Sequence, residues 1–333
     1  MKAMVLAAGL GTRLKPLTFE LPKPMVPVLD RPVMAHIVRL VERQGFDELI
    51  ANLHWFPEAI RGYFGDRLEY RYETELLGTA GGVRNVRDFF GDDLVVVISG
   101  DALTDLDMRA LVARHRAAGG IATLTVKRVP DTREYGVVIH DEDGRVQGFQ
   151  EKPDPAEALS DLGNCGIYCF SPEIFDYFPA ADPVDWAQDV FPALLEHDVP
   201  FHVHEIESYW NDVGSLAELR QGTWDALDGR LDIDVPGEEV RDGLCVGAGS
   251  RLPPDLEVVT PPAWIGEGCQ LGDGVRLMGP VVVGDRCSVG AGASLRETIL
   301  LPGTVVPPGE IVIGAIAGRA GIVETLRPLD ERP

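Results

Sequence analysis

Over roughly the first 225 residues, short apolar runs alternate with segments whose apolar residues recur every three or four positions. The recurring segments predict helices, for example over 33–44 and over 105–118, where Thr104 and Asp107 form an approximate capping box. The apolar runs predict strands at Met4–Leu6, Leu49–Asn52, Leu68–Tyr72, Leu94–Ser99, Ile121–Val126, Val137–His140 and Ile167–Phe170. Strands that alternate with helices are typical of an α/β fold with a mixed, mainly parallel sheet.

A different pattern begins after about residue 228, where an aliphatic residue recurs every six positions. The series has seven members: Ile265, Leu271, Leu277, Val283, Val289, Leu295 and Leu301. Glycine directly follows four of them, at positions 266, 272, 284 and 290. A shorter, out-of-phase series precedes it at Val246, Leu252 and Val258. This hexad predicts a parallel β-helix, left-handed, with the aliphatic residues inside. We therefore expect an α/β domain over 1–228, a linker over 229–240, the β-helix over 241–320 and a C-terminal tail over 321–333.

Length and charge narrow the classes of partner. A chain of 333 residues has room for two domains. Its net charge of −23 argues against nucleic acid and against an anionic membrane as partners. The N-terminus lacks a signal-peptide pattern and the five cysteines are scattered, so we expect a cytoplasmic protein without disulfides.

The stretch LAAGLGTRLKPLT at residues 6–18 places a glycine-rich, cationic loop directly after the first strand. It lacks the third glycine of a dinucleotide-binding motif and the Gly-Lys-Ser/Thr of a P-loop. Its glycines leave backbone N–H groups accessible, Arg13 can bind two phosphate oxygens, and Lys23 adds a charge between two prolines. The loop therefore favours a polyphosphate ligand.

The central apolar run, DLVVVISGD at 93–101, ends in Ser99 and Asp101. The carboxyl ends of strands in open α/β sheets are where ligands bind. Asp101 is therefore a candidate ligand-binding residue, although a helix cap is an equally common role for an aspartate in such a position.

The loop and several later motifs together resemble the sugar-nucleotide pyrophosphorylases, which are sugar-1-phosphate nucleotidyltransferases with a Rossmann-like catalytic domain. The resemblance is closest to their bacterial mannose-1-phosphate guanylyltransferase members and spans nearly the whole chain. The motifs are GLGTRLKPLT (9–18), PKPMVPVLDRP (22–32), LGTAGGVRNV (77–86), SGDALTDLD (99–107), EYGVV (134–138), FQEKP (149–153), NCGIYCF (164–170) and WNDVG (210–214).

The resemblance implies the reaction of an NTP with a sugar 1-phosphate to give an NDP-sugar and pyrophosphate, with GTP and mannose 1-phosphate as first choice. Asp212 would join Asp101 on Mg²⁺, Arg13 would bind the β- and γ-phosphates, and Lys23 would contact the α-phosphate. The implied nucleotide site comprises Leu6, Ala7, Ala8, Gly9, Gly11, Thr12, Arg13, Lys23, Glu75, Gly78, Thr79 and Gly81. The implied sugar-phosphate site comprises Gly136, Glu151, Lys152 and Asn164.

Other functions stay open on the sequence. Leu76 stands where guanylyl members often have proline, so a uridylyl- or thymidylyltransferase for glucose 1-phosphate or an amino-sugar phosphate is the first alternative. A regulatory subunit that binds an NDP-sugar is the second, although the motif residues are intact. The repeat region holds no histidine, which argues against acyl transfer there and favours a role in assembling a homo-oligomer.

Overall fold

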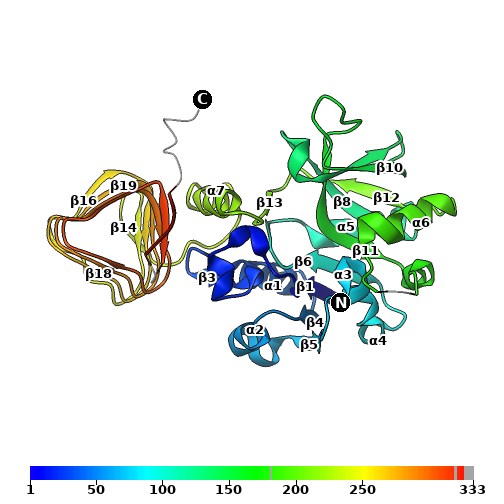
Figure 1. The fold of residues 1–333 in the computed structure, drawn as a ribbon, viewed down its shortest axis with the longest axis horizontal. Helices are drawn as coiled ribbons and strands as arrows, with labels where there is room; N and C mark the ends of the chain where they lie inside the picture. Colours follow the sequence, from blue (N-terminus) through cyan, green and yellow to red (C-terminus); the bar gives the residue numbers. More distant parts are fainter. Residues whose placement is uncertain (181, 319–320, 326–333) are drawn as a thin grey trace. The chain divides into compact units, whose positions relative to one another are not determined.

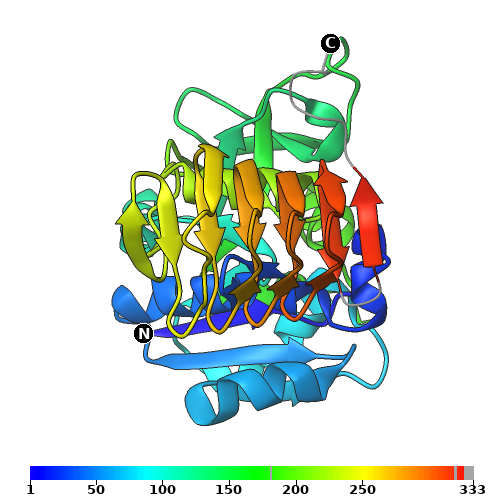
Figure 2. The same ribbon diagram turned by 90° about the vertical axis from the view of Figure 1, so that its left-hand side faces the viewer.

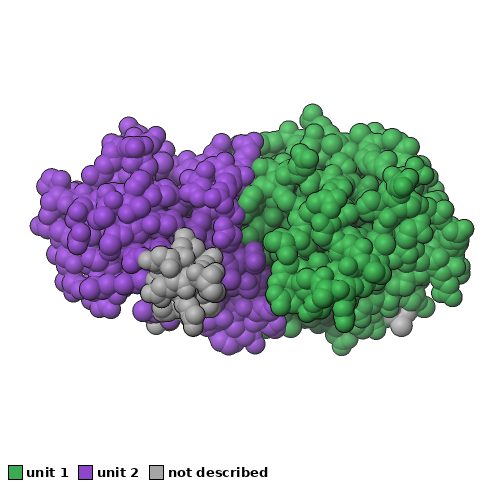
Figure 3. Space-filling model, turned by 90° about the horizontal axis from the view of Figure 1, so that it is seen from above, with its two compact units in different colours: residues 1–11, 21–25, 33–212 green, residues 12–20, 26–32, 213–333 purple. Residues whose placement is uncertain are grey.

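The structure is a computed structural model that describes residues 1–180, 182–318 and 321–325. It divides into two compact units that interleave along the chain and are coloured separately in Figure 3. Unit 1 contains residues 1–11, 21–25 and 33–212, and unit 2 contains residues 12–20, 26–32 and 213–333. The domain limits expected from the sequence stay a prediction.

Unit 1 is built on one mixed sheet (Figure 1). Its main path runs β10 (Val146–Glu151), β9 (Gly136–His140), β11 (Leu162–Phe170), β6 (Val95–Ser99), β1 (Lys2–Leu6), β4 (Glu48–Leu53) and β5 (Glu69–Tyr72). Strands β6, β1, β4 and β5 are parallel, whereas β11 is antiparallel to β6. Strand β8 (Ala122–Arg128) pairs with β11, and β12 (His202–Glu205) pairs with β8. The expected α/β class with a mixed sheet is confirmed.

Helices pack against this sheet and supply much of the apolar core. Helices α1 (Val33–Arg43) and α3 (Gly78–Arg84) contact β1, α5 (Met108–Ala118) contacts β8 and β11, and α6 (Phe191–Glu196) contacts β10. The remaining helical segments of the unit are α2 (Pro57–Phe64), α4 (Arg87–Phe90), η3 (Lys23–Met25), η4 (Gly65–Arg67), η5 (Thr132–Glu134), η6 (Pro172–Tyr177) and η7 (Trp186–Val190). None of the helices in the described ranges is long and apolar enough to cross a membrane.

The start of α5 differs from the sequence expectation. Asp107 is the N-cap, and its carboxylate accepts hydrogen bonds from the N–H groups of Arg109 and Ala110. Thr104 instead ends β7 (Ala102–Thr104), where its hydroxyl donates to the carbonyl of Tyr209 at 2.6 Å. The predicted capping box with Thr104 is therefore wrong, because Thr104 is part of a β-strand and does not cap the helix.

Unit 2 joins short segments from the first 32 residues to one helix and a β-helix. The early segments are η1 (Thr12–Leu14), η2 (Leu17–Phe19), β2 (Pro27–Val28) and β3 (Arg31–Pro32), and α7 (Leu216–Leu227) packs against β2. The later strands are β14 (Glu238–Arg241), β15 (Leu244–Val246), β16 (Glu257–Thr260), β17 (Ala263–Ile265), β18 (Gln270–Leu271), β19 (Arg276–Val283), β20 (Ser288–Val289), β21 (Ser294–Leu300), β22 (Val305–Val306), β23 (Ile311–Ile313), β24 (Ala315–Gly318) and β25 (Gly321–Thr325).

Most of these strands stack in parallel, as Figure 2 shows, and form three faces, whereas β14 and β25 pair antiparallel with β15 and β24. One face contains β15, β17, β19, β21 and β24, a second contains β18, β20 and β22, and the third pairs β16 and β23 with the first halves of β19 and β21. The predicted parallel β-helix is confirmed, and the hexad residues from Ile265 to Leu295 are buried in its core. Residues 326–333 of the predicted tail lie outside the described residues.

The last hexad position needs a correction. Val283 pairs with Leu300, and it is Leu300 that is fully buried, whereas Leu301 is only half-buried. The spacing shortens because the corner that Gly279 and Pro280 form in β19 is formed by the single residue Glu297 in β21. Counting in sixes cannot reveal a one-residue deletion at a corner.

Candidate active site

Three charged side chains from distant parts of unit 1 meet at the ends of β6 and β13 (Trp210–Asp212). The Lys23 ammonium forms an ion pair with the Asp101 carboxylate and lies 3.6 Å from Oδ1 of Asp212. Strand β13 pairs antiparallel with β7, with Asp212 opposite Ala102. This register brings Asp212 next to Asp101, so the two carboxylates predicted to bind metal do lie together.

The environment of Asp101 favours its charged form. Burial raises the pKa of this carboxyl, but the Lys23 ammonium and the hydrogen bond from the Ser99 hydroxyl outweigh it, so the pKa lies below its usual value. Lys23 and Asp101 are mostly buried, with side-chain exposures of 13% and 16%. The result is an anionic carboxylate held on a rigid strand end.

Gly100 allows the ends of β6 and β1 to approach each other. Its N–H donates to the carbonyl of Leu6 at 2.8 Å, and a Cβ atom at this position would lie 2.4 Å from the same oxygen. Only glycine fits such an approach without a shift of the backbone. The start of the glycine-rich loop is thereby fixed beside Asp101. The role of Gly100 in this approach was not predicted from the sequence.

A buried polar chain ties the same loop to the loop before α3. The N–H of Ala7 donates to Oδ1 of Asn52 at 2.8 Å, and Nδ2 of Asn52 donates to Oε1 of Glu73 at 2.8 Å. Oε2 of Glu73 accepts from the N–H of Leu77 at 3.2 Å. Asn52 and Glu73 are 3% and 2% exposed. Both were missed by sequence reasoning, because nothing in a single sequence shows that a polar residue after a strand is buried.

The predicted base- and ribose-binding residues of the α3 loop contact segment 184–186. The N–H of Gly81 donates to the carbonyl of Val184 at 3.1 Å, and the Thr79 hydroxyl donates to Oδ2 of Asp185 at 2.7 Å. Gly78 has a φ of +83° and would place a Cβ 2.3 Å from the Val184 carbonyl oxygen. Glu75 is exposed. The loop is thus held in one conformation by segment 184–186.

Two of the predicted sugar-phosphate residues pair directly across strands β9 and β10. Gly136 lies opposite Glu151, and a Cβ on Gly136 would lie 3.2 Å from Oε2 of Glu151. Lys152 follows with a φ of +48°, in the left-handed region that non-glycine residues rarely occupy, and its N–H donates to the Tyr135 carbonyl at 3.2 Å. Such conformations cluster at functional sites, which directs attention to Lys152.

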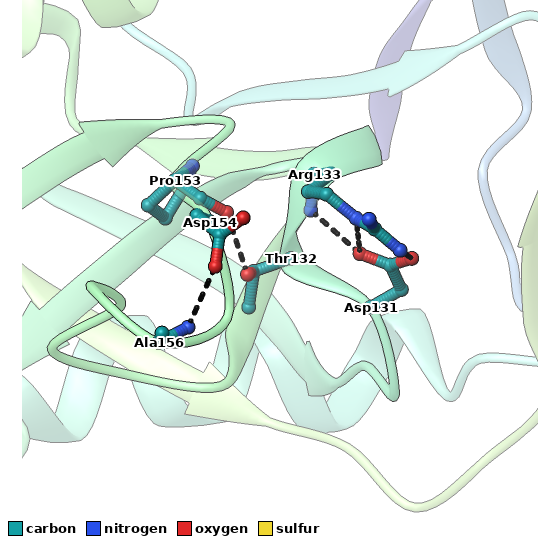
Figure 4. A network of polar contacts seen from close by, with 6 residues as sticks. All are labelled: Asp131, Thr132, Arg133, Pro153, Asp154 and Ala156. Carbon is teal, nitrogen blue, oxygen red and sulfur yellow. Dashed lines mark hydrogen bonds and ion pairs between the residues drawn. The ribbon is translucent and has the colours of Figure 1, made fainter.

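The turn after Lys152 is braced by η5, as Figure 4 shows. The buried hydroxyl of Thr132 points toward Pro153 and donates to its carbonyl at 2.8 Å, while the Asp154 carboxylate accepts from the N–H of Ala156 at 3.0 Å. Asp131 caps the N-terminus of η5, and hydrogen bonds from Arg133 lower the pKa of its carboxyl to about 2. The contact between Thr132 and Pro153 thus fixes the residue that directly follows Lys152.

Asn164 and an aromatic pair complete this side of unit 1. Nδ2 of Asn164 donates to the Tyr168 hydroxyl at 3.0 Å. The rings of Tyr135 and Trp210 pack with centroids 5.3 Å apart, and Nε1 of Trp210 donates to the carbonyl of Cys165 at 3.1 Å. Tyr135 thus joins the backbone of Lys152 to the strand that carries Asp212. Neither aromatic residue was singled out from the sequence.

The remaining loop residues fall on both sides of the division between units. Leu6, Ala7, Ala8, Gly9 and Gly11 belong to unit 1, whereas Thr12 and Arg13 belong to unit 2. Within unit 2, Arg13 packs against the backbone of Gly214, where a Cβ atom would lie 2.9 Å from its Nη2. Leu6 is half-buried, Ala7 and Ala8 are buried, and Gly9 is exposed, with open space around its Cα.

The donor set at the Lys23 cluster fits Mg²⁺. Mg²⁺ is held by one or two carboxylates together with water and substrate phosphates, and Asp101 and Asp212 already converge on one cationic group. Among residues 1–180, 182–318 and 321–325, no group of three or more His, Cys, Asp or Glu side chains comes together as a self-sufficient metal site. Substrate oxygens would therefore have to complete the coordination shell.

Comparisons with known proteins agree with this architecture. The model of the nucleotidyl transferase family matches residues 2–229, and that of the bacterial transferase hexapeptide, with six repeats, matches residues 262–297. A putative glucose-1-phosphate thymidylyltransferase from Bacillus anthracis has a similar fold, with a TM-score of 0.62 and 24% identity over 72% of this chain and 98% of its own.

Two curated relatives cover most of the chain. A UTP–glucose-1-phosphate uridylyltransferase of Synechocystis is 36% identical over 99% of this chain and 90% of its own length. A mannose-1-phosphate guanylyltransferase of Mycobacterium tuberculosis is 33% identical over 89% of this chain and 83% of its own length. These relatives carry different names for base and sugar, so they support the reaction class more strongly than either substrate pair.

Proposed function

Because the chain belongs to the nucleotidyl transferase family, we propose that it transfers a nucleotidyl group from an NTP to a sugar 1-phosphate and releases pyrophosphate. The observation that carries this proposal is the cluster of Lys23, Asp101 and Asp212 at the ends of β6 and β13. It supplies anionic ligands and a positive charge at the place where an α/β sheet binds ligands.

The nucleophile in this reaction is a phosphate oxygen of the sugar 1-phosphate. A phosphate monoester has its second pKa near ~6, so it is already largely dianionic at pH 7 and needs no general base. The protein must instead bring two polyanions together, align the oxygen with the α-phosphorus and stabilise the departing pyrophosphate. Bound Mg²⁺ would supply neutralisation of phosphate charge, with Asp101 and Asp212 as its protein ligands.

The remaining residues divide between the two substrates. Arg13 binds the β- and γ-phosphates and Lys23 the α-phosphate, which requires Lys23 to exchange its carboxylate partners for phosphate oxygens. Leu6, Ala7, Ala8, Gly9, Gly11 and Thr12 surround the base and phosphates, and Gly78, Thr79 and Gly81 bind the base and ribose, with Glu75 beside a guanine amino group. Lys152 binds the sugar phosphate, while Glu151, Asn164 and the N–H of Gly136 bind the sugar.

GTP and mannose 1-phosphate are the first substrate pair of this proposal. The relatives include several with the name mannose-1-phosphate guanylyltransferase. The pair UTP and glucose 1-phosphate is the second, favoured by the 36% identity and near-complete coverage of the uridylyltransferase relative. A regulatory subunit that only binds an NDP-sugar is the third reading, and the presence of Arg13, Lys23, Asp101, Lys152 and Asp212 argues against it.

The proposal is tested by pyrophosphate release with Mg²⁺ over a grid of nucleotides and sugars. The nucleotides are GTP, UTP, dTTP, ATP and CTP, and the sugars are the 1-phosphates of mannose, glucose and N-acetylglucosamine. One dominant signal identifies the pair. No signal from folded protein that still binds an NDP-sugar would replace the enzyme with the regulatory subunit.

We further propose that the catalytic domain spans 1–228, that a linker follows to 240, and that the β-helix over 241–320 joins copies of a cytoplasmic homo-oligomer. Supporting this, Val305 in β22 and Ile311 in β23 are 71% and 64% exposed on the β-helix, although both are large aliphatic residues. Aliphatic side chains on strands of a repeat structure are a common contact surface.

A further inference from the structure

A buried ion pair joins α7 to the β-helix inside unit 2. Nη2 of Arg220 donates to Oε2 of Glu297 at 2.8 Å, and the two residues are 2% and 6% exposed. The Arg220 guanidinium also lies 5.9 Å from the ring of Trp224, one turn further along α7. Charged residues are rarely buried so completely unless they are paired, and loss of one partner leaves the other charge buried without compensation.

Glu297 occupies an unfavourable backbone position to make this contact. It forms the one-residue corner of β21, with a φ of +46°, where the preceding coil has Gly279 and Pro280. Glycine is the residue that adopts positive φ at little cost, so a glutamate here is not explained by the corner. The side chain of Glu297 accounts for a glutamate at this position, because its carboxylate is the partner of Arg220.

The other end of α7 leads directly to Arg13. Ser215 caps the helix, accepting a hydrogen bond from the N–H of Glu218 at 3.2 Å, and Gly214 precedes it. The guanidinium of Arg13 lies close against Gly214, since a Cβ atom there would be 2.9 Å from Nη2 and 3.1 Å from Cζ and would displace the guanidinium. A shift of the start of α7 would therefore move the surface on which Arg13 rests.

We propose that Glu297 and Arg220 are positioning residues that fix α7 and, through Gly214, the guanidinium of Arg13. The inference rests on the proposed function, in which Arg13 binds the pyrophosphate part of the nucleotide. Arg220 lies about 8 Å along the helix axis from Ser215. Over that distance an α-helix moves as a rigid body, so the β-helix sets where Arg13 is held and contributes to catalysis without touching substrate.

The first test compares Glu297→Gln with Glu257→Gln. Both remove a carboxylate charge from the β-helix, but Glu257 is exposed and pairs with Arg276 of the β-helix itself, with Oε2 2.8 Å from Nε. The assays are NDP-sugar synthesis from NTP and sugar 1-phosphate, and its reversal, in which NDP-sugar reacts with pyrophosphate. Glu297→Gln is expected to raise the KM for NTP and for pyrophosphate about tenfold and to leave the KM for sugar 1-phosphate within about twofold. Glu257→Gln is expected to resemble the wild type.

The second test asks whether Glu297 acts through Arg13. In an Arg13→Ala background, Glu297→Gln should change the KM for pyrophosphate by less than about twofold, because the group it positions is gone. An undiminished effect in that background, or an equal rise in every KM, would assign the pair a structural role only and overturn the proposal.

A further variant covers the case in which Glu297→Gln does not fold. Arg220→Met combined with Glu297→Met removes both charges and keeps apolar volume, so no lone charge is buried. If this folded protein has wild-type KM values, the proposal is wrong. A wild type with no activity on any substrate pair would instead defeat the proposed function, and the two failures are therefore distinguishable.

Discussion

Lys23 binds two carboxylates, Asp101 and Asp212, that lie 111 residues apart in the sequence. Asp101 could be predicted from its place after an apolar strand, because strand ends in α/β sheets bind ligands. Asp212 was proposed only by resemblance. What brings it to Asp101 is the antiparallel register of β13 on β7, and pairing between such distant segments has no local signature in one sequence.

Asp101→Asn is expected to lower turnover by at least about 1,000-fold, or about 4 kcal/mol in activation free energy, because it removes an anionic ligand of the metal. The fold is expected to survive, since asparagine keeps a hydrogen-bonding group at the same place. The measurement is pyrophosphate release together with a thermal melt. Asp107→Asn makes the same chemical change at the N-cap of α5, where asparagine also caps, and should retain activity. Full activity in Asp101→Asn would refute the metal assignment.

Gly100→Ala is expected to destabilise the protein by about 1–3 kcal/mol and to lower turnover, because the new methyl group meets the Leu6 carbonyl oxygen at 2.4 Å. Gly62→Ala is the matched control in α2, where a Cβ meets nothing within 4 Å. It should stabilise by about 0.5–1 kcal/mol, as alanine does in a helix. Urea unfolding measures both, and equal effects of the two substitutions would contradict the close approach of β6 and β1.

The elements themselves were largely predictable. All seven expected strands are present, from β1 to β11, and both expected helices form. The hexad identified the β-helix because each inward residue faces the same core. The prediction was wrong where two local structures compete for the same residue. Thr104 was assigned to a helix cap, but it belongs to β7, which pairs with β13. The corner at Glu297 was also not predicted from the sequence, because its side chain pairs with Arg220 in a different element, α7.

Helix α5 carries a pH-sensitive contact with the sheet. His115 is 3% exposed, and its ring nitrogens form hydrogen bonds with the hydroxyls of Thr123 at 3.0 Å and Ser171 at 3.1 Å. Burial, followed by the charges of Arg116 and His202, lowers its pKa below the ordinary 6.5. The unfolded chain therefore binds the proton more readily, and stability rises with pH across the window between the two pKa values.

Acidification from pH 7.5 to below 6.5 should thus reduce the free energy of unfolding, and His115→Gln should reduce that dependence. Urea unfolding at pH 7.5 and 5.5 measures the difference for both proteins. The other histidines affect the wild type and the variant alike, so the difference between the two proteins reports the contribution of His115. A larger pH dependence in the variant would show that His115 is protonated more readily when folded, contrary to its burial.

The whole molecule is expected to be an oligomer in solution. Light scattering should give a mass of twice 36.2 kDa or more, because the β-helix exposes aliphatic residues such as Val305 and Ile311. A mass of 36.2 kDa would contradict the assembly role.

The contact face is tested by Val305→Asp combined with Ile311→Asp, which should lower the mass. Val240→Asp changes another exposed valine, in β14, and should leave it unchanged. If Val240→Asp alone dissociates the oligomer, the assembly uses a different face of unit 2.

The interleaving of the two units along the chain has a consequence for protein engineering. Residues 12–20 and 26–32 belong to unit 2 although they are flanked by unit 1 segments. No single cut in the gene separates the units, so a cassette exchange at residue 228 would leave the early segments of unit 2 and α7 without the β-helix against which they evolved. A chimera with a foreign β-helix should therefore function only if the donor supplies an acidic residue matching Glu297, or if α7 is transplanted with it.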